Sequence, residues 1–173
     1  MILEGAYISL RALEPEDLDF LFRIENNTHF WEVSHTQTPF SKHLLKQYLE
    51  NAHLDIYESK QLRLMIVEKE TEERVGMIDL FDFNPQHQRA GVGILIDTHF
   101  QGKSYAFDAL NVLTYYSFKH LHLHQLYANI TPDNTKSIGL FEKCGFKLIG
   151  EKKDWLLVEG TYKSELLYQL IDE

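Results

Sequence analysis

Apolar and polar positions along the chain follow two periods. In residues 6–13 the apolar side chains Ile8, Leu10 and Ala12 alternate with others, which is typical of a half-buried strand. In residues 106–118 apolar side chains instead recur every three or four positions, the spacing of a one-faced helix. The same reading predicts strands at 6–13, 62–69, 74–83, 89–97, 124–131, 146–155 and 160–171, and helices at 15–26, 41–57, 106–118 and between Pro132-Asp133-Asn134 and Gly145.

The predicted order is β-α-α-β-β-β-α-β-α-β-β, a mixed α/β fold in a single domain over residues 1–173. The helix at 106–118 is a crossover, so the strands on either side of it should be parallel neighbours in a mostly antiparallel sheet. Residues 27–40 are expected to form a loop. Its aromatic side chains, Phe30 and Trp31, either shape a substrate pocket or pack against the domain.

The turn at residues 101–104 lies where a strand ends and the long helix begins. Free N–H groups and the positive end of the helix dipole favour an anion there, and Gly102 has no Cβ to block the approach. An ordinary capping turn would have the same sequence features. The helix that follows Asn134 should begin at the same end of the sheet, where α/β proteins often bind ligands. Together the two sites would fit coenzyme A, which has a pyrophosphate and an amide-bearing pantetheine arm.

Composition and charge argue against several classes of protein. The net charge of −9, with scattered Lys and Arg, argues against nucleic-acid binding and mildly favours a cationic partner. No apolar run reaches the ~20 residues of a membrane span, and the first five residues do not form a signal peptide. Cys144 is the only cysteine, so we expect a cytoplasmic protein without intrachain disulfides. His120, His122 and His124 have no partner at ligand spacing, so no metal site is predicted.

Two motifs resemble the signatures of the GNAT (Gcn5-related) N-acetyltransferases. The run from Gln101 to Ala106 resembles their Gln/Arg-x-x-Gly-x-Gly/Ala motif, and Asn134 followed by Gly145-Phe146 resembles their second motif. The resemblance covers nearly the whole chain. It is closest to the ribosomal-protein alanine acetyltransferases and the bacterial spermidine acetyltransferases, which the segments 83–96 and 158–162 also resemble.

This resemblance implies a fold with a splayed pair of strands and acetyl-CoA in the gap. The backbone of Leu95 and Ile96 would bind the pantetheine amides, and Asn134 would contact the pantetheine or a bound water. The N–H groups of the turn would hold the pyrophosphate; these belong to Gln101, Gly102, Lys103, Ser104, Tyr105 and Ala106. The implied reaction is direct attack by a primary amine, with a polyamine such as spermidine favoured and a protein N-terminal amine next. The resemblance also implies a homo-oligomer.

Three positions depart from the family pattern. Ser104 replaces the first glycine of the turn, and its Cβ is expected to crowd it. Phe141 replaces the tyrosine that protonates the leaving thiolate in many relatives. Gly91 replaces a glutamate of the spermidine enzymes. Either the thiolate leaves without a side-chain acid, another group serves, or the chain is a catalytically weak acyl-CoA binder.

Few side chains are candidates to replace the missing polar groups. Tyr127 lies on the strand beside the gap, although it could simply pack there. Glu25 and Glu32 could bind a cationic amine or relay its proton, or be solvated acids. His87 precedes the cofactor strand and could act as a base, because imidazole titrates near neutral pH. We therefore predict Tyr127, Glu32 and His87 as the catalytic candidates.

Overall fold

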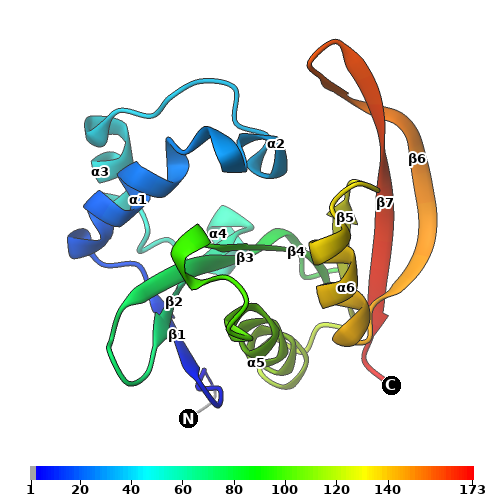
Figure 1. Ribbon diagram of the computed structural model, residues 1–173. Helices are drawn as coiled ribbons and strands as arrows, with labels where there is room; N and C mark the ends of the chain where they lie inside the picture. Colours follow the sequence, from blue (N-terminus) through cyan, green and yellow to red (C-terminus); the bar gives the residue numbers. More distant parts are fainter. Residues whose placement is uncertain (1–2) are drawn as a thin grey trace.

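The computed structural model describes residues 3–173, and all seven strands join in one sheet (Figure 1). Met1 and Ile2, which begin the stretch in which no signal peptide was expected, lie outside the described residues. The sheet order is β1-β2-β3-β4-β5-β7-β6, and every neighbouring pair is antiparallel except β4 and β5. The mixed α/β prediction is thereby confirmed. The strands are β1 (Ile8–Ala12), β2 (Leu62–Glu68), β3 (Arg74–Asn84), β4 (Arg89–Ile96), β5 (Gln125–Ile130), β6 (Lys147–Val158) and β7 (Thr161–Ile171).

Six α-helices and three short 3-10 helices lie between the strands of the described chain. The long helix predicted at 106–118 is α5, and the one after Asn134 is α6. The helical segments are η1 (Pro15–Asp17), α1 (Leu18–Glu25), η2 (Thr28–Phe30), α2 (Trp31–Ser34), α3 (Lys42–Glu50), α4 (Ile56–Ser59), η3 (Thr98–Phe100), α5 (Tyr105–Lys119) and α6 (Thr135–Lys143).

Three expected elements differ from the structure. The helix predicted at 41–57 is divided, because α3 ends at Glu50 and the Asp55 carboxylate caps a new turn, α4, by accepting the N–H groups of Tyr57 and Glu58. The expected loop at 27–40 contains η2 and α2, which begin where the Asn27 side chain accepts the N–H of His29. Strand β6 continues to Val158, beyond the predicted end at 155.

Helices cover both faces of the β1–β4 part of the sheet. α1 and α3 pack on one face, over Met65, Val67 and Met77, whereas α5 covers the other face with a larger core that includes Ile66 and Ile78 (Figure 1). The alternation of β2 and β3 side chains between these two cores is the period-2 pattern that predicted the strands.

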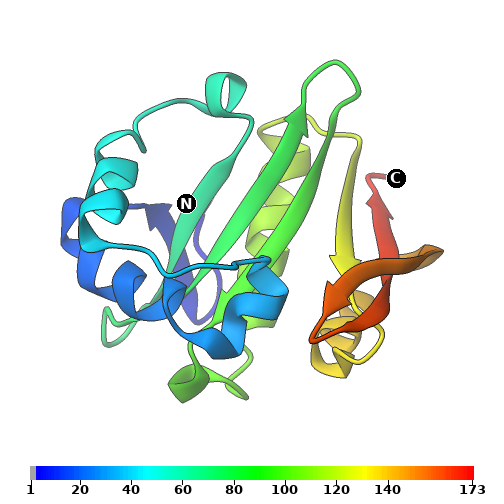
Figure 2. The same ribbon diagram turned by 90° about the horizontal axis from the view of Figure 1, so that it is seen from above.

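β4 and β5 are paired over only three positions. Arg89 lies opposite Gln125, Ala90 opposite Leu126 and Gly91 opposite Tyr127, and beyond Gly91 the two strands diverge (Figure 2). β5 continues to pair with β7, and β4 continues to pair with β3. The sheet therefore opens between Val92–Ile96 on one side and Ala128–Ile130 on the other.

Asp17 links the first helix to the sheet through two arginines. Its carboxylate is fully buried and accepts two hydrogen bonds from Arg11, at 2.8 and 2.9 Å, and a third from Arg74. It also accepts the backbone N–H of Glu14 at 2.8 Å. Burial opposes ionisation, but the hydrogen bonds from Arg11, Arg74 and the Glu14 backbone, with the charge of Arg11, outweigh it and lower the pKa of Asp17 from 3.8 to about 2.

Replacing Asp17 by Asn should destabilise the fold in a pH-dependent way. Because the pKa is lowered in the folded state, the carboxylate contributes about 2 kcal/mol above pH ~4, and this contribution is lost as the pH falls from 3.8 toward 2. Urea unfolding of Asp17→Asn should show a loss of at least about 2 kcal/mol at pH 7 that shrinks over this window. Asp19→Asn is the control, since the Asp19 side chain is 86% exposed and pairs with Lys42 at the surface. A constant difference between wild type and Asp17→Asn from pH 7 to pH 2 would contradict the assignment.

Candidate functional site

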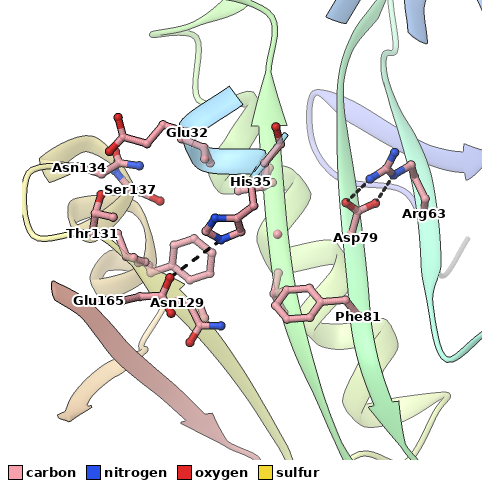
Figure 3. Close-up of a pocket in the computed structure, with 18 residues that line it drawn as sticks. Glu32, His35, Arg63, Asp79, Phe81, Asn129, Thr131, Asn134, Ser137 and Glu165 are labelled. Carbon is pink, nitrogen blue, oxygen red and sulfur yellow. Dashed lines mark hydrogen bonds and ion pairs between the residues drawn. The ribbon is translucent and has the colours of Figure 1, made fainter. Parts of the chain in front are cut away.

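A cavity of about 330 Å³ occupies the gap between β4 and β5 (Figure 3). The two diverging strands form its walls, and α2, the start of α6 and β7 close its rim. The lining side chains are mixed in character. Those used below are Glu32, His35, Arg63, Asp79, Phe81, Asn129, Asn134, Phe141 and Glu165.

The predicted anion turn lies between β4 and α5. Gly102 has a φ of +79°, and Ser104 adopts the left-handed conformation with a φ of +65°. Serine reaches this conformation less readily than glycine does, so the substitution leaves the turn in place at an energetic cost on the order of 1 kcal/mol. The backbone N–H groups of residues 102–107 find no acceptor among residues 3–173, and a Cβ at Gly102 would meet no atom within 4 Å. These donors are therefore available to an anion at the helix N-terminus.

The backbone of β4 presents alternate residues to the gap. The N–H of Asp97 donates to the Val75 carbonyl at 2.9 Å, so the backbone groups of Asp97, and of Leu95 two residues earlier, face β3. Those of Ile96 face away from β3, and the Ile96 carbonyl accepts the side-chain amide of Gln101 at 3.1 Å. This alternation favours Ile94 and Ile96, in place of the predicted Leu95 and Ile96, as the residues whose backbone faces the gap.

Asn134 lies at the cavity rim as the N-cap of α6. Its Oδ1 accepts the N–H of Ser137 at 3.2 Å, which leaves the Nδ2 group as a donor. Phe141, one turn further on, is 2% exposed; its ring lines the cavity and packs edge-on against Phe146, with ring centroids 5.0 Å apart. The part of the cavity wall that Phe141 forms is therefore apolar, and this side chain offers no proton donor.

Glu32 is the predicted catalytic candidate that lines the cavity. Its carboxylate accepts a hydrogen bond from Lys163 of β7 at 2.6 Å, and Lys163 also donates to Asp133 at 2.8 Å. The hydrogen bonds to Asp133 and Glu32 raise the pKa of Lys163, and the one from Lys163 lowers the pKa of Asp133. The Glu32 carboxylate is thus already engaged by an ammonium group.

Arg63 and Asp79 form a second charged group, at the β3 side of the cavity. Arg63 donates to both Asp79 oxygens, at 2.7 and 3.1 Å (Figure 3). Its third hydrogen bond goes to Glu25, at 2.8 Å. Burial opposes the charge of Arg63, but the charge and hydrogen bonds of Asp79 raise its pKa. Glu25, which was considered either as a binder or relay of the amine or as a solvated acid, is thereby part of a partly buried ion-pair network behind the cavity.

Glu165 and His35 face each other across the cavity rim. The Glu165 side chain is only 6% exposed, and its Oε1 accepts a hydrogen bond from Lys152 at 2.5 Å. Its other oxygen lies 4.0 Å from Nε2 of His35, whose side chain is 60% exposed (Figure 3). Lys152 also donates to Asn129 at 3.1 Å, so it connects β6, β5 and β7 behind the carboxylate.

Tyr127 and His87, the other predicted catalytic residues, do not line this cavity. Tyr127 packs edge-on against Phe81 with ring centroids 5.8 Å apart, its hydroxyl lies 3.5 Å from Asp82, and burial followed by the charge of Asp82 raises its pKa. His87 is exposed in the turn between β3 and β4, where its N–H donates to Asn84. Their catalytic roles therefore stay predictions that the cavity does not support.

Sequence reasoning did not select His35, Asp79 or Glu165 as catalytic. His35 was noted only as part of the 27–40 segment, and the aromatic content of that segment was the one signal that pointed to a pocket. Glu165 and Lys152 face each other through the register of β6 and β7, which a single sequence does not reveal.

Neither a metal-binding cluster nor a membrane-spanning helix is found among residues 3–173. Within residues 3–173, no three His, Cys, Asp or Glu side chains are grouped so that they could bind a metal ion. None of the helices in this part of the chain is both long and apolar enough to cross a membrane.

Comparison with known proteins relates the chain to acetyltransferases. The family profile described as an acetyltransferase (GNAT) domain matches residues 8–147. Spermidine N(1)-acetyltransferase of Vibrio cholerae is 30% identical over 162 residues, which cover 92% of this chain and 90% of the relative. The [ribosomal protein uS5]-alanine N-acetyltransferase of Escherichia coli is 34% identical over 79 residues, or 46% of this chain and 41% of the relative.

Solved structures give the same relationship. The crystal structure of spermidine N-acetyltransferase from Vibrio cholerae in complex with CoA and spermine superposes with a TM-score of 0.87 at 28% identity, over 96% of both chains. A dodecameric structure of that enzyme in an intermediate state has a TM-score of 0.80, also at 28% identity, over 96% of this chain and 95% of the other.

Gly91 is explained by the ring of Phe81. A Cβ at Gly91 would lie 2.3 Å from two atoms of that ring, whereas a Cβ at Gly93 would meet nothing closer than 4.0 Å. The glycine in the strand thus lies at a point of close approach, and the approaching group is a side chain.

Gly91→Ala should therefore destabilise the protein, whereas the matched control Gly93→Ala should not. The Phe81 ring must move to admit the methyl group, at a cost of about 1–3 kcal/mol, while the change at Gly93 should stay within ~0.5 kcal/mol. The free energy of unfolding of both variants is measured by urea denaturation. The explanation fails if the two substitutions have equal effects.

Proposed function

The chain belongs to the acetyltransferase (GNAT) family, and we propose that it transfers the acetyl group of acetyl-CoA directly to a primary amine. The observation that carries the proposal is the gap between β4 and β5, which lies beside a helix N-terminus with six free backbone N–H groups, those of residues 102–107. The family alone does not specify the acceptor. The whole of residues 1–173 would act as one catalytic domain.

The proposed cofactor site uses backbone groups for most of its contacts. The N–H groups between Gln101 and Ala106 would bind the pyrophosphate, with the dipole of α5 favouring its charge. The backbone of Ile94 and Ile96 would pair with the pantetheine amides, much as a further strand would. The free Nδ2 group of Asn134 would donate to the same arm. The thioester would then lie in the cavity near Phe141.

The acceptor would enter the cavity from the side of α2 and β7. A polyamine such as spermidine is favoured by the relative of Vibrio cholerae and by the net charge of −9. A protein N-terminal amine is the next candidate, because the chain also resembles the uS5-alanine enzyme. By analogy with the dodecameric relative, we propose a homo-oligomeric assembly.

The reaction would be a single acyl transfer in a ternary complex. The acceptor ammonium loses a proton, its nitrogen attacks the thioester carbon, the C–S bond breaks, and the thiolate takes up a proton as it leaves. Orientation of the two reactants can contribute about 7–11 kcal/mol in well-aligned cases. Backbone N–H groups that polarise the carbonyl would add to this contribution.

A second candidate is a catalytically weak acyl-CoA-binding protein that serves as a sensor or regulator. It is favoured by Phe141, which cannot protonate a thiolate, and by Ser104, which holds the turn in a less favourable conformation. Its cofactor site would be the same, so the two candidates differ in turnover and not in binding.

A thiol-release assay with a panel of amines tests the proposal. Polyamines, amino acids, aminoglycosides and N-terminal peptides are each offered with acetyl-CoA, and acetyl-CoA binding is measured by calorimetry in parallel. We expect turnover with at least one primary amine. Acetyl-CoA binding without any thiol release would favour the acyl-CoA-binding alternative.

Gly102→Trp should abolish acetyl-CoA binding by filling the space above the free N–H groups. Gly160→Trp is the matched control, since Gly160 has the same φ of +79° and equally open surroundings but lies in the turn between β6 and β7. Calorimetry should show binding to the control and none to Gly102→Trp. Equal affinity in the two variants would refute the pyrophosphate placement.

A further inference from the structure

Each carboxylate that lines the cavity is already paired with a cation. Glu32 accepts from Lys163 at 2.6 Å and Glu165 accepts from Lys152 at 2.5 Å. Asp79 is held by both branches of Arg63. A carboxylate in such a pair is a poor acceptor for the proton of an ammonium group, because protonation would break the ion pair.

His35 is the remaining titratable side chain in the lining, and it is free to take up a proton. Among the described residues, no hydrogen bond within 3.5 Å involves its ring, and its nearest charged partner is Glu165, at 4.0 Å from Nε2. Imidazole is also the side chain whose ordinary titration range is nearest to physiological pH, which suits a general base.

The backbone holds His35 at the cavity in a defined conformation. It is the C-cap of α2 with a φ of +56°, and its N–H donates to the Trp31 carbonyl. Trp31 is in turn fixed by the hydrogen bond from its indole to the Glu25 carbonyl, 2.9 Å long. A histidine in the left-handed region is uncommon, and such positions are often found at functional sites.

We propose that His35 is the general base of the acetyl transfer and that Glu165 is its positioning residue. This inference rests on the proposed function. With Nε2–H directed at the Glu165 carboxylate, Nδ1 is the nitrogen that accepts a proton. The distance of 4.0 Å is longer than a hydrogen bond, and such contacts commonly shorten once reactants are bound.

The proposed step balances as follows. His35 takes one proton from the acceptor ammonium and becomes an imidazolium. The neutral amine attacks the thioester carbon, the C–S bond breaks, and the second nitrogen proton passes to the leaving thiolate, which gives an amide and the free thiol of coenzyme A. His35 then returns its proton to solvent, to which it is 60% exposed. No oxidant, metal or further reactant is required.

Several charged groups surround the imidazole. The carboxylates are those of Glu165 on β7, Glu32 on α2 and Asp79 on β3. The cations are Lys152, Lys163 and Arg63, and each of them is paired with one of these carboxylates.

The test is the pH dependence of kcat/KM with the best acceptor of the panel. His35→Asn keeps a residue that tolerates the positive φ but removes the base, so kcat should fall about 100-fold or more and the acidic limb of the profile should disappear. Calorimetry should show unchanged acetyl-CoA binding. His43→Asn is the control, since His43 is exposed on α3 outside the cavity lining, and it should behave as wild type.

Two further variants separate a chemical role from a structural one. In His35→Gly the glycine can adopt the same positive φ, and imidazole added to the solution should restore part of the activity. Glu165→Gln should lower kcat, though less than His35→Asn does, and should change the acidic limb of the profile, which loss of a purely structural residue would not do. Turnover by His35→Asn within twofold of wild type, with the limb intact, would overturn the base while leaving the acetyltransferase proposal in place. Acetyl-CoA binding by wild type without turnover on any amine would overturn both.

Discussion

β4 and β5 share three residue pairs and then diverge, and the position of the site follows from that divergence. Buried backbone N–H and C=O groups need partners, and an open edge within a sheet exposes a row of them. Each strand keeps its other neighbour, so the sheet remains intact on both sides of the gap. The inner edges are left for a ligand that can supply amide groups of its own. The pantetheine arm is such a ligand, and the free N–H groups at the start of α5 lie at the end of β4 where its phosphates would be needed.

The polar chemistry of the cavity is unusual in that its acids are neutralised by side chains of the same chain. Arg63, Lys152 and Lys163 each occupy a carboxylate, and they come from β2, β6 and β7. A pair with a buried member, such as Glu165 with Lys152, contributes little net stability, but removing one partner is costly because it leaves an uncompensated charge. The arrangement therefore fixes the positions of the strands around the gap and leaves the ring of His35 as the titratable group of the lining that has no hydrogen-bond partner among the described residues.

Much of the fold could be predicted from the sequence, because it depends on local periodicity. The alternation in residues 6–13 and the one-faced pattern in 106–118 are repeated wherever a strand or long helix is half buried. The turn at 101–104 and the cap at Asn134 were also local signals, and they lie in the structure where the motifs placed them. α2 was missed because four residues are too few to show a helical period. The division of 41–57 was missed because its apolar spacing continues through the capping residue Asp55.

The acceptor side of the site could not be predicted in the same way, because it depends on register and long-range pairing. Glu165 meets Lys152 through the pairing of β6 with β7, and Glu32 meets Lys163 across more than a hundred residues of sequence. The predicted contribution of Leu95 illustrates the same limit. One residue of register decides which backbone groups face the gap, and only the bond from Asp97 to Val75 shows which they are. Phe81 could not be named from the sequence as the reason for a glycine at position 91, because the pairing of β3 with β4 brings its ring there.

The three pairs between β4 and β5 also bear on how the chain folds. Strands β1–β4 are drawn from residues 8–96 and strands β5–β7 from residues 125–171, so each part of the sheet is contiguous in sequence. The two parts meet through one short parallel contact whose connection is the whole of α5. Closing that contact fixes a long connection in exchange for few hydrogen bonds, so its entropic cost is high relative to its gain. The join that creates the gap is thus the boundary of the sheet with the fewest residue pairs, and in folding it should form after the strands on each side of it have paired.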